Sequence, residues 1–341
     1  MSRASWTATD GGMKIPTTRF GRARTLLLWA AVLPTFAWAV LRAGGWTLEM
    51  LAPLFAFTPY AAIWSLILLG AAFWLRRYAA ASCVFVAALL LFLCVVPRAL
   101  PGADRGPRTG VALHVLTANT LAGTADPATL VRLVRENDVG VLALQELTLA
   151  GRAALTEAGL DVLLPYSSVA DPLSESFEDT TGSALYSRFP MTDAGVRLNA
   201  GGFQQAYGTI HPPAGVPLLV ESAHPVAPHS LGTIDGWRLD LANEPVPEPN
   251  GPPRVLLGDF NATLDHEPLR RLIGRGYRDA ADTVGKGLIP TWGPVALQPA
   301  RLVTIDHVLV DRRIGVFRVT IHNLPRSDHR AVLAELFVPY S

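Results

Sequence analysis

Two patterns of apolar residues divide the sequence near residue 100. Before that point, three long stretches carry almost no charged residues: 25–43, 51–75 and 78–96. Each is close to the ~20 residues that a helix needs to cross the hydrocarbon core of a bilayer. We therefore predict three transmembrane helices within residues 25–96, preceded by an N-terminal segment of residues 1–24.

Positive residues beside these stretches predict their orientation. Five precede the first stretch and two separate the second from the third: Arg3, Lys14, Arg19, Arg22 and Arg24, then Arg76 and Arg77. Lys and Arg are enriched on the cytoplasmic side, so the N-terminus is expected in the cytoplasm and the chain after Arg98 outside. A cleavable signal peptide is the alternative for the first stretch, although the two later stretches would still anchor the chain. Residues 97–110, with their Pro, Gly and Arg content, are predicted to be a linker.

After residue 110 the pattern changes to short β-rich runs separated by loops and helical segments. Helical periodicity appears at 127–136, 151–159 and 266–274. This alternation predicts one layered α/β or α+β domain over residues 111–341, a size that a single hydrophobic core can serve.

Many of these β-rich runs end in a polar residue that an ordinary strand-end loop does not need. The polar residues at or just beyond the run ends are Asn119, Glu146, His224, Asp259, Asn261, Asp306, Asp328 and His329. Strand ends on one edge of a layered sheet converge in space, and we therefore expect these side chains to line one cleft.

The chemistry of this set is that of a hard-metal site. Its oxygen donors suit Mg²⁺ or Mn²⁺, and they are Glu146, Asp259, Asn261 and Asp328. Softer metals are disfavoured, because both cysteines of the chain lie within residues 78–96. His224 and His329 add groups that exchange protons near neutral pH. The combination favours metal-assisted attack of water on phosphorus.

Five short motifs occur in order along this domain, each at an apolar run: TANT, LQE, GDFN, IDH and SDH. In this order they resemble the signature of the endonuclease/exonuclease/phosphatase superfamily, over about residues 111–340. The resemblance implies a four-layered α/β sandwich, in which two packed β-sheets are flanked by helices. It also implies hydrolysis of phosphoesters with a divalent cation.

The resemblance assigns a metal-binding role to three of the residues. Glu146 of LQE would be the principal Mg²⁺ ligand, supported by Asn119 of TANT, and Asp328 of SDH would complete the metal environment. Asp259 of GDFN would orient or deprotonate the attacking water, while Asn261 would hold a phosphate oxygen.

The remaining assignments concern the phosphate. His329 would contact it, oriented by Asp306 of IDH, and His224 matches a histidine that nuclease-like and sphingomyelinase-like members use as a second acid or base. Tyr186 occupies the position of a phosphate-contacting tyrosine or arginine in some members, but alternation along its strand could equally bury it. His307 is interpreted as structural.

Other residues favour structural roles. Trp237 and the pair Thr291-Trp292 are predicted to pack rather than to bind substrate. Histidines expected in solvent are His211, His229, His266 and His322. Gly-Asp followed by Asn is also ordinary turn chemistry, so the motif gains weight only from its companions.

Charge limits the substrate class. From residue 110 onward the chain carries 18 Lys plus Arg against 25 Asp plus Glu, a formal charge of −7. A domain that binds duplex nucleic acid through its phosphates normally presents a basic surface. Four arginines do gather around one predicted helix, and we interpret them as a solvated face: Arg270, Arg271, Arg275 and Arg278.

Together these observations favour a membrane-embedded, Mg²⁺-dependent phosphodiesterase or nuclease, with Mn²⁺ as a possible substitute, whose catalytic domain is extracytoplasmic. One alternative is a phosphatase or a phospholipase- or sphingomyelinase-like hydrolase acting on lipid head groups or inositol phosphates. A remote alternative is a catalytically silent binding domain. The substrate is therefore a nucleic acid, a phospholipid or a phosphorylated small molecule, and no obligate protein partner is evident.

Overall fold

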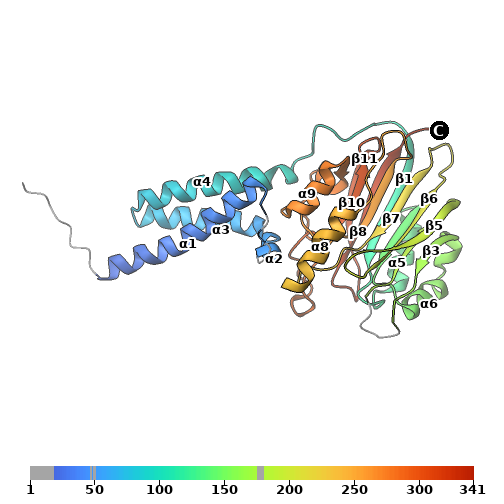
Figure 1. The fold of residues 1–341 in the computed structure, drawn as a ribbon, viewed down its shortest axis with the longest axis horizontal. Helices are drawn as coiled ribbons and strands as arrows, with labels where there is room; N and C mark the ends of the chain where they lie inside the picture. Colours follow the sequence, from blue (N-terminus) through green and yellow to red (C-terminus); the bar gives the residue numbers. More distant parts are fainter. Residues whose placement is uncertain (1–18, 47, 49–50, 175–179) are drawn as a thin grey trace, which may run out of the picture.

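The N-terminal helices extend from one end of a β-rich domain (Figure 1). The computed structural model describes residues 19–46, 48, 51–174 and 180–341. Three long helices pack side by side, and their mutual contacts are made largely by alanine and other small or aliphatic side chains. They are α1 (Arg19–Gly44), α3 (Thr58–Trp74) and α4 (Tyr78–Val95).

Within the described residues, two helical segments, not three, are long and apolar enough to cross a membrane. They are Arg22–Gly44 and Tyr78–Ala99. The predicted span at 51–75 is divided into a four-residue helix, α2 (Ala52–Phe55), and the 17-residue α3. A proline in the first turn of each piece explains the division, because proline begins helices readily but disrupts their interior. The prediction of three long spans is therefore wrong for the second stretch.

The domain contains two six-stranded mixed sheets packed face to face, so the predicted α/β sandwich is confirmed. The first sheet has the order β11-β12-β1-β2-β4-β3 and the second β5-β6-β7-β8-β10-β9. Their strands are β1 (Val111–Asn119), β2 (Val141–Gln145), β3 (Tyr166–Ala170), β4 (Ser183–Ser187), β5 (Met191–Leu198), β6 (Gln204–Ile210), β7 (Leu218–Ala223), β8 (Arg254–Asp259), β9 (Tyr277–Asp279), β10 (Asp306–Asp311), β11 (Gly315–Asn323) and β12 (Arg330–Val338).

Three hydrophobic clusters hold the layers together. Inward-facing residues of both sheets, such as Val115, Val220 and Val308, form the central cluster. A second cluster lies between the first sheet and its helices, and a third between the second sheet and its helices. Those helices are α5 (Pro127–Glu136), α6 (Leu149–Glu157) and α7 (Leu160–Leu163) on the first sheet, and α8 (Leu231–Asn243) and α9 (Glu267–Gly274) on the second. The short α10 (Ala280–Thr283) follows β9.

Strand order places the polar run ends on one edge of the sandwich. In the first sheet β1 and β2 are parallel neighbours, with Asn119 beside Gln145 at their ends. In the second sheet β7 and β8 are parallel, with Ala223 beside Gly258, and Asp306 at the start of β10 lies opposite Asp259. The two central strand pairs therefore deliver their polar residues to the same rim of the two sheets.

The segment between the helices and the first strand lies against the domain. The 3₁₀ turn η2 (Val96–Ala99) follows α4 directly, and Arg98 within it is buried. The Gly102 amide then donates to the Thr283 carbonyl at 3.0 Å, and Pro101 forms an isolated bridge with Val284. The end of α4 is therefore joined to the domain by hydrogen bonds as well as by the chain.

Candidate active site

Asn119, at the end of β1, joins the two sheets at the rim. Its amide nitrogen donates to Glu146 Oε1 at 2.9 Å and to Asp259 Oδ2 at 3.1 Å. The side-chain oxygen Oδ1 of Asn119 accepts from the Leu121 amide at 2.9 Å. The buried side-chain amide of Asn119 therefore holds together Glu146, which follows β2 in the first sheet, and Asp259, at the end of β8 in the second.

Glu146 is held by an unusual backbone conformation. It follows the last residue of β2 with φ of 56°, in the left-handed region that residues other than glycine seldom adopt. Its Oε2 accepts from the Ala122 amide at 3.0 Å. Burial raises the pKa of this carboxyl, opposed by the hydrogen bond from Asn119. Backbone strain of this kind is concentrated at functional sites.

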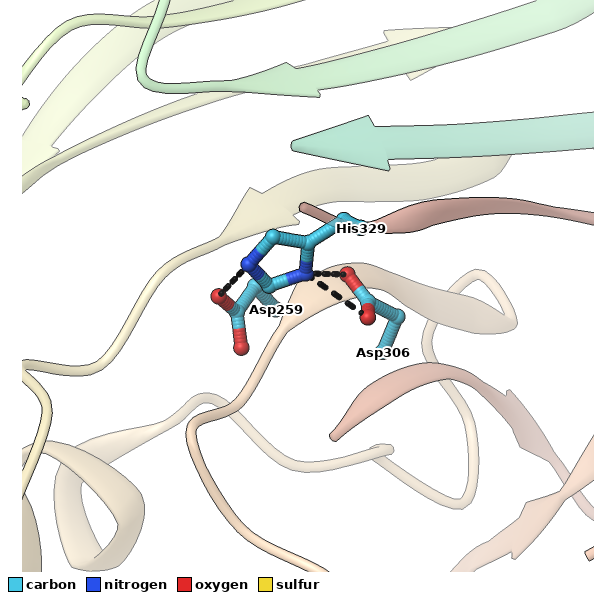
Figure 2. Close-up of side chains that lie close together, drawn as sticks. All are labelled: Asp259, Asp306 and His329. Atoms are coloured by element: carbon cyan, nitrogen blue, oxygen red, sulfur yellow. Dashed lines mark hydrogen bonds and ion pairs between the residues drawn. The ribbon is translucent and has the colours of Figure 1, made fainter. Parts of the chain in front are cut away.

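His329 lies between two carboxylates of the second sheet, as Figure 2 shows. Its Nδ1 is 2.9 Å from Asp306 Oδ2, and its Nε2 is 3.6 Å from Asp259 Oδ2. Burial opposes a charge on this imidazole, but Asp306 and Asp259 outweigh burial and raise the pKa of His329 to about 10. His329 is therefore an imidazolium at neutral pH, with Nδ1 facing Asp306.

Asp259 is a buried carboxylate with other acidic side chains nearby, so its negative charge is disfavoured. It is 2% exposed, and burial raises its pKa to about 7, although the positive charge of His329 opposes the shift. Its Oδ1 accepts from the Asn261 amide at 2.8 Å. A carboxylate with a pKa near neutrality is suited to accept a proton from water.

One of the two carboxylate oxygens of Asp328 accepts a hydrogen bond. Its Oδ2 accepts from the Trp292 indole at 2.9 Å, whereas Oδ1 is buried without a hydrogen-bond partner among the described residues. That oxygen lies 3.8 Å from His329 Nε2. A buried carboxylate oxygen without a donor is costly, and a cation would relieve the cost.

His224 follows β7 and faces the same point from the second sheet. Its Nε2 is 4.0 Å from Asp259 Oδ2, and its ring meets Phe203 edge-on at 4.6 Å. Burial, followed by the charge of His329, lowers the pKa of His224 to about 3. His224 is therefore neutral, and its Nδ1 lacks a hydrogen-bond partner in the described part of the chain.

Two further predicted residues are held by contacts within the domain. The Asn261 side chain donates to the Pro225 carbonyl at 3.0 Å, which fixes its amide in place. Tyr186 is not brought to the site. It is 3% exposed within the cluster beneath the helices of the first sheet, and burial raises its pKa to about 12. Alternation along β4 explains this, because Leu185 faces the central cluster and Tyr186 the opposite side.

The acidic composition of the site fits a divalent cation. The ligand atoms of Asp259, Asp306 and His329 lie within 4.8 Å of one another, so this buried group could hold a metal. His329 is better explained as the charged partner of the two aspartates, because an imidazolium has no free lone pair. The unpaired Oδ1 of Asp328 and the buried carboxylate of Glu146 remain as oxygen donors for a cation.

Several supporting residues escaped sequence analysis. Trp292, predicted to pack, instead orients Asp328, and the Thr291 hydroxyl accepts from the Asp306 amide at 3.1 Å. Ser327 donates to the Asn119 carbonyl at 2.9 Å and accepts from the His329 amide at 3.0 Å. The serine of SDH was the available signal, since it precedes two site residues directly.

Two expectations about exposure are wrong. His266, expected in solvent, is buried, and its Nε2 lies 2.8 Å from the Ala52 carbonyl of α2. Of the arginines interpreted as a solvated face, Arg278 is buried and pairs with Asp104 at 3.2 Å. In contrast, His307 is structural as predicted, with Nδ1 2.6 Å from Asp279 and Nε2 2.8 Å from the Ala262 carbonyl.

Solved structures share this fold at low sequence identity. An endonuclease/exonuclease/phosphatase from Beutenbergia cavernae is 18% identical with a TM-score of 0.55, covering 67% of this chain and 72% of that one. A family protein from Bacteroides thetaiotaomicron is 15% identical (TM-score 0.50; 67% and 99% covered). Truncated Caenorhabditis elegans TDP2 is 16% identical (TM-score 0.50; 67% and 99% covered). At these identities the likeness shows the fold alone.

Sequence comparison gives the family. No curated protein matches the chain. The profile of the Endonuclease/Exonuclease/phosphatase family matches residues 116–329, which contain all eight of the residues gathered at the rim. The match covers more than half of the sequence and begins and ends inside the sandwich. The chain therefore belongs to the Endonuclease/Exonuclease/phosphatase family.

Proposed function

We propose that this protein is a membrane-anchored, Mg²⁺-dependent phosphodiesterase. The observation that carries the proposal is the grouping of Asp259 and Asp328 around one buried imidazole, His329, at the rim of the sandwich. The Asn119 amide joins Glu146 to Asp259 at the same place. Family membership supports phosphoester hydrolysis in general. The diester specificity, the metal and the anchoring belong to the proposal.

Glu146, Asn119 and Asp328 are the proposed holders of the cation. Glu146 and Asp328 offer carboxylate oxygens, and the amide of Asn119 fixes Glu146 in position. When bound, Mg²⁺ supplies a positive charge that polarises the phosphoryl group and stabilises its developing negative charge.

The remaining residues are proposed to transfer protons and to stabilise charge on the substrate. Asp259 accepts a proton from the attacking water, because its raised pKa makes it a stronger base than an exposed carboxylate. His329, kept charged and oriented by Asp306, stabilises negative charge on the phosphoryl oxygens. Neutral His224, whose Nε2 lies 4.0 Å from Asp259 Oδ2, donates a hydrogen bond to the substrate. Asn261 is proposed to position the Asp259 loop rather than to bind phosphate through its side-chain nitrogen.

The helices support membrane anchoring. Their outward-facing side chains are large and apolar, and Leu33, Ile63 and Phe85 are each more than half exposed. Contiguous apolar surface of this kind is rare on monomeric soluble proteins. We propose that the helices embed the chain in the membrane, with the N-terminus cytoplasmic and the catalytic domain outside.

A lipid head group is the second candidate substrate. The domain is formally −7 from residue 110 onward, which disfavours tight binding of nucleic acid. Anchoring beside a membrane raises the effective concentration of phospholipid substrates. A phospholipase- or phosphatase-like activity on lipid or inositol phosphates is therefore the variant of the proposal that the helices favour.

The test uses the full chain in detergent micelles or nanodiscs. Hydrolysis with Mg²⁺ and Mn²⁺ is measured on single- and double-stranded nucleic acid, phospholipids, inositol phosphates and a chromogenic phosphodiester. The Glu146→Gln variant should lose activity on every substrate, and Glu157→Gln, at an exposed position on α6, should keep it. Equal activity of the two variants would overturn the assignment. Preference for phospholipid would select the second candidate.

A further inference from the structure

A cavity lies where the helices meet the domain, apart from the proposed active site. Its volume is about 580 Å³, and it is bounded by the end of α4, η2, α9, β9 and α10. None of the eight residues of the candidate active site lines it. Five arginines do: Arg42, Arg98, Arg270, Arg278 and Arg312.

The charges around this cavity do not balance. Arg42 and Arg98 both bind Asp265, at 2.6 Å each, and Arg278 pairs with Asp104. Of the other lining acids, Asp279 is paired with His307, which leaves Asp282 as the one further carboxylate among the lining residues. The arginines therefore outnumber the carboxylates available to them, and the cavity is electropositive.

The excess of positive charge is clearest at the guanidinium group of Arg270. Within the described chain, its side chain donates to the Leu264 and Asp265 carbonyls, at 3.2 and 2.5 Å, and pairs with no carboxylate. Burial, followed by repulsion from Arg42, lowers the pKa of Arg270 to about 10. An anion beside Arg270 would remove this penalty, and guanidinium groups bind phosphate through paired hydrogen bonds.

Apolar side chains continue from the cavity along the membrane-facing surface. Leu93 of α4 and Leu100 after η2 both line the cavity, and they are 64% and 59% exposed. Both lie at the domain-proximal end of the apolar helix Tyr78–Ala99. A ligand here meets cationic groups on the domain side and apolar groups on the helix side, which is the polarity of a phospholipid.

We propose that this cavity binds an anionic phospholipid, with the head-group phosphate at Arg270 and Arg312 and the acyl chains along Leu93 and Leu100. Phosphate is the recognised chemistry, and the apolar path along α4 favours a lipid over a free anion. The site rests on the proposed membrane insertion but not on the proposed hydrolysis. Basic pockets between transmembrane helices bind anionic lipid head groups. A lipid bound here would contact both the helices and the domain.

The experiment measures lipid binding to the detergent-solubilised full chain by native mass spectrometry. All proteins carry Glu146→Gln, so that turnover does not consume the lipid. Phosphatidylglycerol, phosphatidylcholine and inorganic phosphate are titrated separately. We expect phosphatidylglycerol to bind best, and Arg270→Gln to weaken it about fivefold, as befits one arginine near a lipid surface. The matched control is Arg271→Gln on the same helix, where the arginine pairs with Glu267 and is 68% exposed.

Arg312 is exposed, and Arg312→Gln provides a second test if Arg270→Gln does not fold. It should weaken phosphatidylglycerol binding and leave phosphatidylcholine binding unchanged. Equal affinity for both lipids, or equal affinity in Arg312→Gln and Arg271→Gln, would overturn the proposal. Inorganic phosphate that displaces the lipid at equal concentration would overturn the lipid as occupant. Because hydrolysis is disabled throughout, failure here leaves the proposed reaction untouched, and loss of activity in other variants leaves this site untouched.

Discussion

Two aspartates six positions apart show how the molecule uses buried charge in two different ways. Asp259 at the active-site rim and Asp265 at the helix junction are 2% and 1% exposed. Burial raises the pKa of Asp259 to about 7, against the charge of His329. Burial also opposes ionisation of Asp265, but hydrogen bonds and charge from Arg98 and Arg42 outweigh it and lower its pKa.

The difference lies in the partners. Asp265 receives two guanidinium groups, so its charge is compensated within the chain. Asp259 shares one imidazolium with Asp306 and lies close to Glu146 through Asn119. The rim therefore has more negative charge than the chain compensates, as expected of a cation site, whereas Asp265 and its two arginines form a compensated structural contact.

The largest contrast should come from removing each carboxylate. Asp259→Asn should lower the rate of phosphoester hydrolysis by about 10²–10⁴-fold, because it removes the proposed base. It should not lower the unfolding temperature, because it removes a buried charge that lacks full compensation. Steady-state kinetics and thermal unfolding of the full chain measure both effects, with exposed Asp161→Asn as the control. A variant that keeps wild-type rates would contradict the role of Asp259.

Asp265→Asn should behave in the opposite way. Removing this partner leaves Arg42 and Arg98 buried without a carboxylate, and breaking a buried pair of this kind costs about 3–5 kcal/mol. Thermal or denaturant unfolding should therefore show strong destabilisation, while hydrolysis measured well below the unfolding temperature is retained. Loss of activity without loss of stability would show that the junction is part of the catalytic machinery.

Cation binding should stabilise the rim specifically. Adding Mn²⁺ or Mg²⁺ to chelator-treated protein at 100 times its dissociation constant should raise the free energy of unfolding by about 2.7 kcal/mol. At the same cation concentration, Glu146→Gln should gain only about 1.4 kcal/mol or less, because its binding is at least tenfold weaker, and Asp265→Asn should keep the full gain despite its lower baseline. Differential scanning calorimetry distinguishes these cases. Equal gains in all proteins would place the cation elsewhere.

The two aspartates should also respond oppositely to pH in the presence of a chelator. The ordinary value for both is 3.8. Because the pKa of Asp259 is raised on folding, its contribution to stability is present below 3.8 and is lost as pH rises through about 7. Because the pKa of Asp265 is lowered, its contribution is present above 3.8 and is lost as pH falls below it. Asp259→Asn should flatten the upper part of the stability curve, and Asp265→Asn the acidic part.

The smallest effect is expected from the residue that orients Asp328. Trp292→Phe keeps the ring but removes the indole donor at 2.9 Å, so it should cost about 1 kcal/mol of stability. We expect a modest loss of activity accompanied by weaker Mg²⁺ activation. Mg²⁺ titrations of the rate test this. Unchanged activation would mean that Trp292 only packs, as its sequence context suggested.

The positions of the site residues could be predicted from short local motifs in the sequence. Each of Asn119, Glu146 and Asp259 ends or follows a short apolar run, and strand ends in a layered domain meet at a rim. What the sequence did not reveal is the backbone of Glu146 or the orientation of Tyr186. The left-handed φ of Glu146 depends on contacts with the loop after β1, and the burial of Tyr186 depends on which face of β4 meets the helices.

The junction was not predictable, because its partners are remote in sequence. Arg42 and Asp265 are 223 positions apart, and Arg98 and Asp265 are 167 apart. Neither arginine lies in a motif, so each resembles an ordinary charged flank of an apolar helix. The same applies to His266, which looks solvated until α2 provides the Ala52 carbonyl. Ion pairs between distant segments have no periodicity, and only the packed structure reveals them.

The most direct test of the central claim is Mn²⁺ binding to the full chain, followed by electron paramagnetic resonance. If the carboxylates at the rim are assembled for a cation, the wild type and Asp265→Asn should bind Mn²⁺ with similar affinity. Glu146→Gln should bind at least about 10-fold more weakly, because changing even an outer-shell partner of a metal costs about 10–100-fold in affinity. Wild-type affinity in Glu146→Gln would contradict the account.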